Sequence, residues 1–155
     1  MGDALAIVLM KRRGFKDENF ARFHPGGSLG KKLLLKVENV MKIENLPIVN
    51  LDANIKDIVH VITTCKSGLV VVLDKKDIKG VITDGDIRRA METNEKNFFK
   101  LQADELMTRD PKTINKNEKL IDANEIMNET KINTLLVVND DDNLIGLVQL
   151  FDLGL

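Results

Sequence analysis

Residues 80–90 of the chain read GVITDGDIRRA, and they follow the apolar run GLVVVLD at residues 68–74. Residues 146–155 read GLVQLFDLGL, and they follow a matching run, TLLVVND, at residues 134–140. The two glycines that open these segments are 66 positions apart. A repeat of this length is longer than most solenoid units. It indicates one small α/β unit that is present twice, and two such units usually pack as a pseudo-symmetric pair with clefts between them.

The first copy contains a helix, two strands and a second helix in that order. Residues 54–65 carry apolar side chains at helical spacing and predict an amphipathic helix. The apolar positions are Ile55, Ile58, Val59 and Ile62. Two strands rich in β-branched residues follow, joined by the polar turn DKKD. A closing helix begins at residue 84, and Asp84 or Asp86 is placed to cap its first turn.

The second copy repeats this order. Residues 120–131, LIDANEIMNETK, predict a helix, and two strands are expected on either side of the acidic turn DDDN. The final residues, FDLGL, predict a truncated last helix. The acidic turn lacks the spacing of a calcium loop, so we expect no metal site there.

Composition excludes several classes of function. The 155 residues carry a formal charge of −1 with acidic and basic residues interspersed, and Trp and Tyr are absent. We therefore expect no binding to nucleic acid or to anionic membranes. The single cysteine, Cys65, cannot form an internal disulfide and suggests a reducing compartment. No apolar run approaches the roughly 20 residues that span a bilayer, and no signal peptide opens the chain. These features predict a cytoplasmic protein.

The fold resembles that of a known family. Residues 80–86 fit the motif G-h-x-T-x-x-D of the cystathionine-β-synthase (CBS) domain, and MTRDPKTI at residues 107–114 is similar to the start of a CBS repeat. The resemblance implies an α/β (α+β) fold made of a tandem CBS-domain pair with pseudo-two-fold symmetry. It divides the chain into CBS repeat 1 at residues 37–98 and CBS repeat 2 at residues 99–155.

The resemblance also implies ligand-binding residues, because CBS pairs bind nucleotides in their clefts. By position in the motif, Thr83 would face a phosphate and Asp86 the ribose hydroxyls. Asp152 matches Asp86 in the second copy, but Gln149 stands where the motif has Thr, which leaves phosphate binding there open. The other candidate ligand-binding residues are Asp84, Arg88, Arg89, Thr108 and Thr113.

The first 36 residues resemble the end of a different domain. Residues 3–13 predict a short helix, and FARFHPGGSLGKKLLLK at residues 20–36 predicts a loop. With TDGDIRR in the first repeat, these segments resemble D-arabinose-5-phosphate isomerases, in which a sugar-isomerase domain precedes a CBS pair. That family interconverts ribulose 5-phosphate and arabinose 5-phosphate for Kdo, lipopolysaccharide or capsule biosynthesis. The resemblance makes residues 1–36 the tail of that domain and a linker, and makes His24 a catalytic residue of the parent enzyme only. Most of the catalytic domain is missing, so we expect no turnover by this chain alone.

The expected function is regulatory, with two alternatives. The favoured ligand is CMP-Kdo, an end product of the pathway, with an adenine nucleotide second, and no cofactor is expected. The partners would be the protein's own sugar-isomerase domain and further copies of the chain, as a dimer of CBS pairs and a tetramer in the parent enzyme. One alternative is a structural CBS module that assembles the enzyme with empty clefts. The other is a free-standing sensor of adenine nucleotides.

Overall fold

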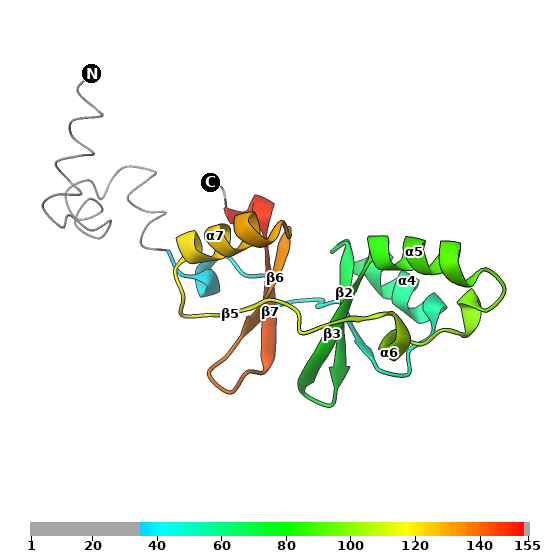
Figure 1. The fold of residues 1–155 in the computed structure, drawn as a ribbon. Coiled ribbons are helices and arrows are strands. Elements are labelled where there is room, and N and C mark those ends of the chain that lie inside the picture. The colour runs from blue at the N-terminus through cyan, green and yellow to red at the C-terminus, as the bar shows by residue number, and fades with distance from the viewer. Residues whose placement is uncertain (1–34, 154–155) are drawn as a thin grey trace, which may run out of the picture.

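A computed structural model describes residues 35–153 of the chain. These residues form two β-sheets with helices on their outer sides (Figure 1). The helix predicted at residues 3–13, His24 and most of the loop predicted at residues 20–36 lie outside the described residues. Among the described residues, no helix has both the length and the apolar character needed to cross a membrane.

The first sheet has four strands in the order β1-β2-β3-β4. Its strands are β1 (Ile48–Asn50), β2 (Leu69–Asp74), β3 (Asp77–Thr83) and β4 (Thr108–Arg109). Helix α4 (Ile55–Cys65) connects the parallel pair β1 and β2, and helix α5 (Asp84–Asn94) follows β3 directly. A 3-10 turn η2 (Phe98–Lys100) and the short helix α6 (Ala103–Leu106) complete this half.

The second sheet has three strands in the order β5-β6-β7. They are β5 (Thr113–Asn115), β6 (Thr134–Val138) and β7 (Leu144–Gln149). Helix α7 (Leu120–Thr130) joins β5 to β6, and β7 ends in the 3-10 turn η3 (Leu150–Leu153). Both antiparallel hairpins have a register shift at corresponding places, between Val72 and Leu73 and between Val137 and Val138. The predicted duplication and the tandem pair are confirmed.

Helix α4 shows how the local sequence produces these elements. The side chain of Asn54 accepts hydrogen bonds from the backbone N–H groups of Lys56 and Asp57 and so caps the first turn. Ile55, Ile58 and Ile62 are buried, as the helical spacing predicts. Val59 was predicted to share this apolar stripe, and that prediction is wrong, since 42% of Val59 is exposed. The face of α4 that is buried is therefore narrower than the face that carries apolar side chains.

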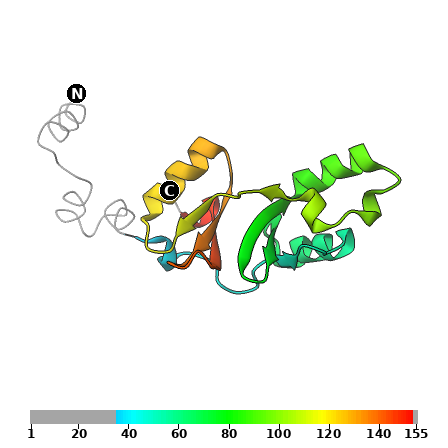
Figure 2. The same cartoon turned by 60° about the horizontal axis from the view of Figure 1, so that its bottom comes forward.

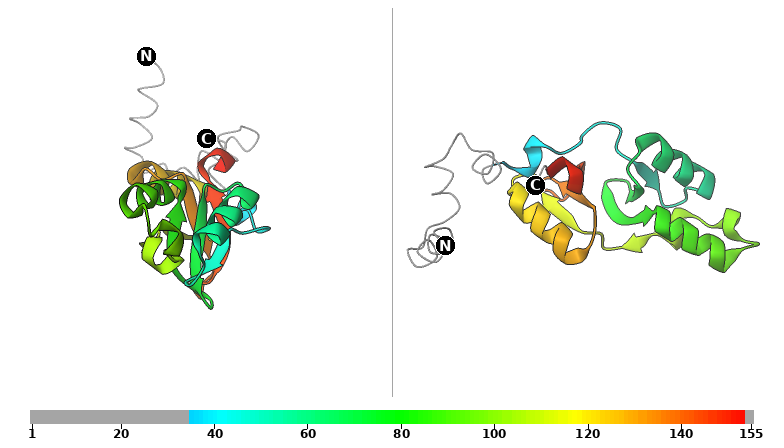
Figure 3. Two further views of the ribbon diagram at one scale, coloured as in Figure 1. Left: turned by 90° about the vertical axis from the view of Figure 1, so that its right-hand side faces the viewer. Right: turned by 90° about the horizontal axis from the view of Figure 1, so that it is seen from above.

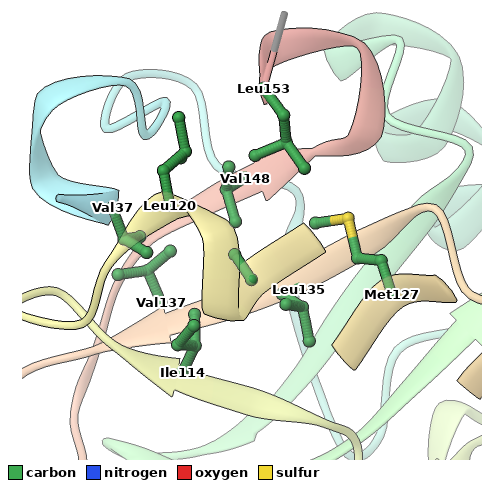
Figure 4. Packing of buried hydrophobic residues seen from close by; sticks show 9 residues of the cluster. Val37, Ile114, Leu120, Met127, Leu135, Val137, Val148 and Leu153 are labelled. Atoms are coloured by element: carbon green, nitrogen blue, oxygen red, sulfur yellow. The ribbon is translucent and has the colours of Figure 1, made fainter. Parts of the chain in front are cut away.

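The segments that open the two copies cross between the halves. The 3-10 turn η1 (Val37–Asn39) belongs to the first copy in sequence, yet Val37 packs in the core of the second half (Figure 4). Its neighbours there include Leu120 and Val137. Conversely, Ala103 of the second copy packs in the core of the first half, and β4 pairs with β3. Each packed half therefore contains chain from both copies.

The two halves meet through their sheets. A separate apolar cluster joins Leu69 and Val71 of β2 to Leu136 of β6 and Leu147 of β7. Figures 2 and 3 show α4 and α5 on the outer side of the first sheet and α7 on the outer side of the second. With the helices outside, the ends of strands and helices from the two halves face one another where the two sheets meet.

Candidate ligand-binding cleft

A cavity of about 1070 Å³ lies between the two halves. One wall comes from the first half, through residues 66–69 and the end of β3. The opposite wall comes from the second half, through residues 130–134 and 149–151. The connecting segment 108–112 closes one side. This volume slightly exceeds the usual range for small-molecule sites, which is roughly 300 to 1,000 Å³.

Thr83 and Gln149 occupy corresponding positions in the two walls, Thr83 at the end of β3 and Gln149 at the end of β7. The Gln149 Nε2 atom donates to the backbone carbonyl of Ser67 at 3.3 Å and to Thr134 Oγ1 at 3.3 Å. Gln149 therefore joins the two halves in the lining of the cavity. The Ser67 hydroxyl in turn donates to the Leu69 carbonyl at 2.7 Å, so this part of the wall is held in place.

Thr83 is held by a capping box with Asp86. The Thr83 N–H donates to Asp86 Oδ2 at 2.8 Å, and the Thr83 hydroxyl donates to the same oxygen at 2.6 Å. In return, the Asp86 N–H donates to Thr83 Oγ1 at 3.3 Å. The sequence predicted Asp84 or Asp86 as the cap of α5, but the N-cap is Thr83, and Asp86 completes the box from the third helical position.

Both oxygens of the Asp86 carboxylate accept hydrogen bonds from residues at the start of α5. Oδ1 accepts from Arg89, and the side chain is only 13% exposed. Burial acts to raise the pKa of Asp86, but the hydrogen bonds from Thr83 and Arg89, together with the charge of Arg89, outweigh it and hold the pKa below its usual value. Asp86 is therefore ionised near neutral pH.

The structure places the predicted ligand-binding residues in two groups. Thr83 and Thr108 line the cavity. The other six are not among its lining residues, and these are Asp84, Asp86, Arg88, Arg89, Thr113 and Asp152.

The residues outside the lining differ in their surroundings. Asp84 and Arg88 are exposed on the first turns of α5. Thr113 begins β5 and pairs in register with Leu136. The Asp152 carboxylate accepts from the Gln149 N–H at 3.1 Å, as Asp86 does from Thr83.

The cavity also has charged residues that the sequence analysis did not single out. Within the part of the chain that the structure describes, three lysines line it, Lys66, Lys112 and Lys131, together with one carboxylate, Asp110. A signal for two of them was present, since Lys66 and Lys131 each follow the last residue of the repeated helix. No group of three or more His, Cys, Asp and Glu that could hold a metal ion is found within residues 35–153.

Comparison with known proteins identifies related sequences. Residues 37–93 and 103–153 match the family model described as the CBS domain. The probable arabinose 5-phosphate isomerase of Haemophilus influenzae is 42% identical over 96% of the chain and 44% of the relative. The arabinose 5-phosphate isomerase KpsF of Escherichia coli is 43% identical over 98% of the chain and 46% of the relative. The chain thus spans less than half the length of these curated relatives.

Solved structures share the arrangement of the two halves. The crystal structure of CBSX2 in complex with AMP has a TM-score of 0.67 and 26% sequence identity, covering 77% of this chain and 92% of CBSX2. The CBS domain of a bacterial CNNM/CorC family Mg²⁺ transporter in complex with ATP has a TM-score of 0.67 at 18% identity. That alignment covers 79% of this chain and 87% of the transporter domain, and at this identity it shows the fold.

Proposed function

Because the chain belongs to the CBS-domain family, we propose that its cleft binds a nucleotide and thereby regulates an arabinose 5-phosphate isomerase domain in the same polypeptide. The cavity between the halves, with Thr83 and Thr108 in its walls, is the observation that carries this proposal. The sequence similarity to arabinose 5-phosphate isomerases supports the nature of the regulated domain. His24 would act in that domain as an acid or base in the proton transfer between aldose and ketose.

Two nucleotide classes are candidates for the ligand. CMP-Kdo is favoured by the logic of end-product control, since the isomerase would begin the route to Kdo. An adenine nucleotide is supported by the related CBSX2 structure, which contains AMP. In either case Thr108 would donate to a phosphate oxygen. The single hydroxyl hydrogen of Thr83 is donated to Asp86, so Thr83 would contact the ligand as part of the cavity wall, in the orientation that Asp86 fixes. The proposed location is the cytoplasm.

A thermal-shift experiment with the 155-residue chain tests this function. AMP, ATP, CMP and CMP-Kdo are added separately at millimolar concentration, and a ligand at 100 times its dissociation constant should stabilise the fold by about 2.7 kcal/mol. Thr108→Val removes one hydroxyl from the cavity and should reduce the shift. Thr63→Val removes an exposed hydroxyl that bonds to Val59 within α4 and should leave the shift unchanged. If none of the four compounds moves the transition, the proposal is wrong.

A structural role is the second candidate, and one contact favours it. Gln149 occupies the position that is threonine in the motif. Its side-chain amide donates hydrogen bonds, one of which joins the two halves. A purely structural pair would keep its oligomeric state and its stability whether or not nucleotides are present. Analytical ultracentrifugation with and without ATP or CMP-Kdo, run beside the thermal-shift series, distinguishes the two functions.

A further inference from the structure

Two of the cavity's lysines occupy a backbone conformation that favours glycine. Lys66 ends α4 with φ 51° and ψ 38°, and Lys131 ends α7 with φ 58° and ψ 35°. A left-handed conformation is unfavourable for any residue with a Cβ, and helices most often end on glycine there. The chain nevertheless carries lysine at both corresponding sites, and both line the cavity.

The C-terminal ends of α4 and α7 are by themselves unfavourable places for an anion. Each helix ends at the cavity, and the C-terminal end of a helix carries a partial negative charge. Lys66 and Lys131 follow these helix ends directly and line the cavity, and Lys112 lines it from the connecting segment.

These three lysines have no ion-pair partner among residues 35–153. Among residues 35–153, Asp110 is the one carboxylate in the lining, so positive charge from these residues is in excess there. By contrast, the motif carboxylates Asp86 and Asp152 already accept hydrogen bonds from the backbone of their own turns.

We propose that the cleft selects nucleotides with more than one anionic group, and that Lys66, Lys112 and Lys131 provide the selection. A nucleoside triphosphate and a nucleotide joined to an acidic sugar share this chemistry. The apolar side chains of Leu69, Val81 and Leu136 would contact the neutral part of the ligand. This inference rests on the proposed nucleotide-binding function and adds its charge requirement.

Calorimetric titration of the full 155-residue chain tests the charge requirement. The probes are adenosine, AMP and ATP in one series, and cytidine, CMP and CMP-Kdo in the other. In whichever series contains the ligand, we expect the affinity to rise at least tenfold from the monophosphate, which has one anionic group, to the member with more than one. That member is ATP in the first series and CMP-Kdo, with a phosphodiester and a carboxylate, in the second. That gain should shrink as salt is added, because exposed charges are screened.

Glycine substitutions separate binding from folding. Lys66→Gly and Lys131→Gly should each lower the affinity for the ligand with more than one anionic group about tenfold. Thermal stability should stay the same or rise, because glycine fits the backbone. Lys112→Gln tests the third lysine without a backbone change. Lys75→Gly is the matched control, since Lys75 has φ 58° in the β2–β3 turn and lies outside the cavity lining. It should show the same stability response with unchanged affinity.

The outcomes distinguish this inference from the function on which it rests. Equal affinity for the monophosphate and for the ligand with more than one anionic group would overturn the charge requirement and leave nucleotide binding intact. Binding that is unaffected by all three lysine substitutions would do the same. If none of the six compounds binds, both the proposed function and this inference fail.

Discussion

Asp86 connects the fold and the site at the scale of a single residue. Its carboxylate accepts from the Thr83 N–H and hydroxyl and from Arg89. These contacts begin α5 and fix the orientation of Thr83, which lines the cavity. Asp86 can therefore affect a ligand by positioning Thr83.

Replacing Asp86 should destabilise the protein in a pH-dependent way. Asp86→Asn removes the charge that accepts these hydrogen bonds, and the loss of a helix cap costs about 1 kcal/mol. The pKa of Asp86 is lowered from 3.8 in the folded chain, so its stabilising effect is present above that pH. It is lost as the pH falls through the lower, folded-state pKa. Urea unfolding of both proteins from pH 7 to pH 3 should show a stability difference that is constant above about pH 5 and narrows below about pH 4.

Asp84→Asn provides the control for this series. Asp84 begins the same helix, so its replacement removes a charge near the same helix end without touching the box. A stability difference between wild type and Asp86→Asn that persists unchanged at the lowest pH would contradict the assigned role.

The sequence could predict part of the arrangement of Thr83 and Asp86. Thr83 and Asp86 are three positions apart at a strand–helix junction, which is the spacing of a capping box, and their proximity could be predicted. The spacing does not specify side-chain geometry, so it could not predict that the Thr83 hydroxyl donates to Asp86. Lys112 lines the cavity because the connecting segment 108–112 passes between the two halves, and no local sequence pattern indicates that path.

At the scale of elements, the repeated glycines explain why the opening segments fit against β3 and β7. A Cβ added to Gly146 would lie 2.9 Å from the Lys42 carbonyl oxygen and 3.1 Å from Met41 Sδ. A Cβ added to Gly80 would lie 2.7 Å from the Thr108 carbonyl oxygen. Both glycines therefore allow a backbone segment of the other copy to approach closely.

Gly146→Ala should lower the free energy of unfolding by about 1 to 3 kcal/mol, the usual range for overpacking. The backbone carbonyl of Lys42 cannot move away cheaply, because Lys42 and Leu147 exchange two backbone hydrogen bonds, of 2.8 and 3.0 Å. Denaturant unfolding with unchanged m-value measures the loss.

Gly85→Ala serves as the comparison for this substitution. Gly85 lies in α5, and a Cβ there would meet its nearest atom, in the Arg89 side chain, at 3.4 Å. Alanine should therefore be tolerated or even stabilising, by up to about 1 kcal/mol, through its higher helix propensity. If both alanine variants behaved alike, the close-approach explanation for Gly146 would fail.

Helices and hairpins were predictable from the sequence because their signals are local. The spacing of Ile55, Ile58 and Ile62 indicated α4, and its observed bounds agree with the prediction to within one residue. Val59 was misplaced because the width of the buried stripe depends on what covers the helix. The last element was predicted as a truncated helix and is the 3-10 turn η3.

At the scale of the whole molecule, the crossed opening segments tie the two halves together. Val37 is fully buried in the second half, where its N–H donates to the Glu118 carbonyl at 2.9 Å. The Leu120 N–H donates to the Leu35 carbonyl at 2.8 Å. This exchange was not predictable, since no local pattern states which sheet a short opening segment will join.

Val37→Ala should therefore destabilise the second half of the molecule, although the strands of that half lie more than 60 residues later in the sequence. Loss of the buried methyl groups costs about 2 kcal/mol. Hydrogen exchange should become faster in α7 and β6, while α4 and β2 are less affected.

Val49→Ala is the matched variant, because Val49 packs in the core of the first half. It should show the opposite pattern of exchange. Faster exchange confined to α4 and β2 in the Val37 variant would mean that the opening segment stays with its own copy.

The most direct test of nucleotide binding between the halves is hydrogen exchange of the wild-type chain with and without saturating ATP or CMP-Kdo. We predict slower exchange in the four segments that line the cavity, residues 66–69, 108–112, 130–134 and 149–151. Slower exchange on another surface, with these four segments unchanged at saturation, would contradict a binding site in the cleft.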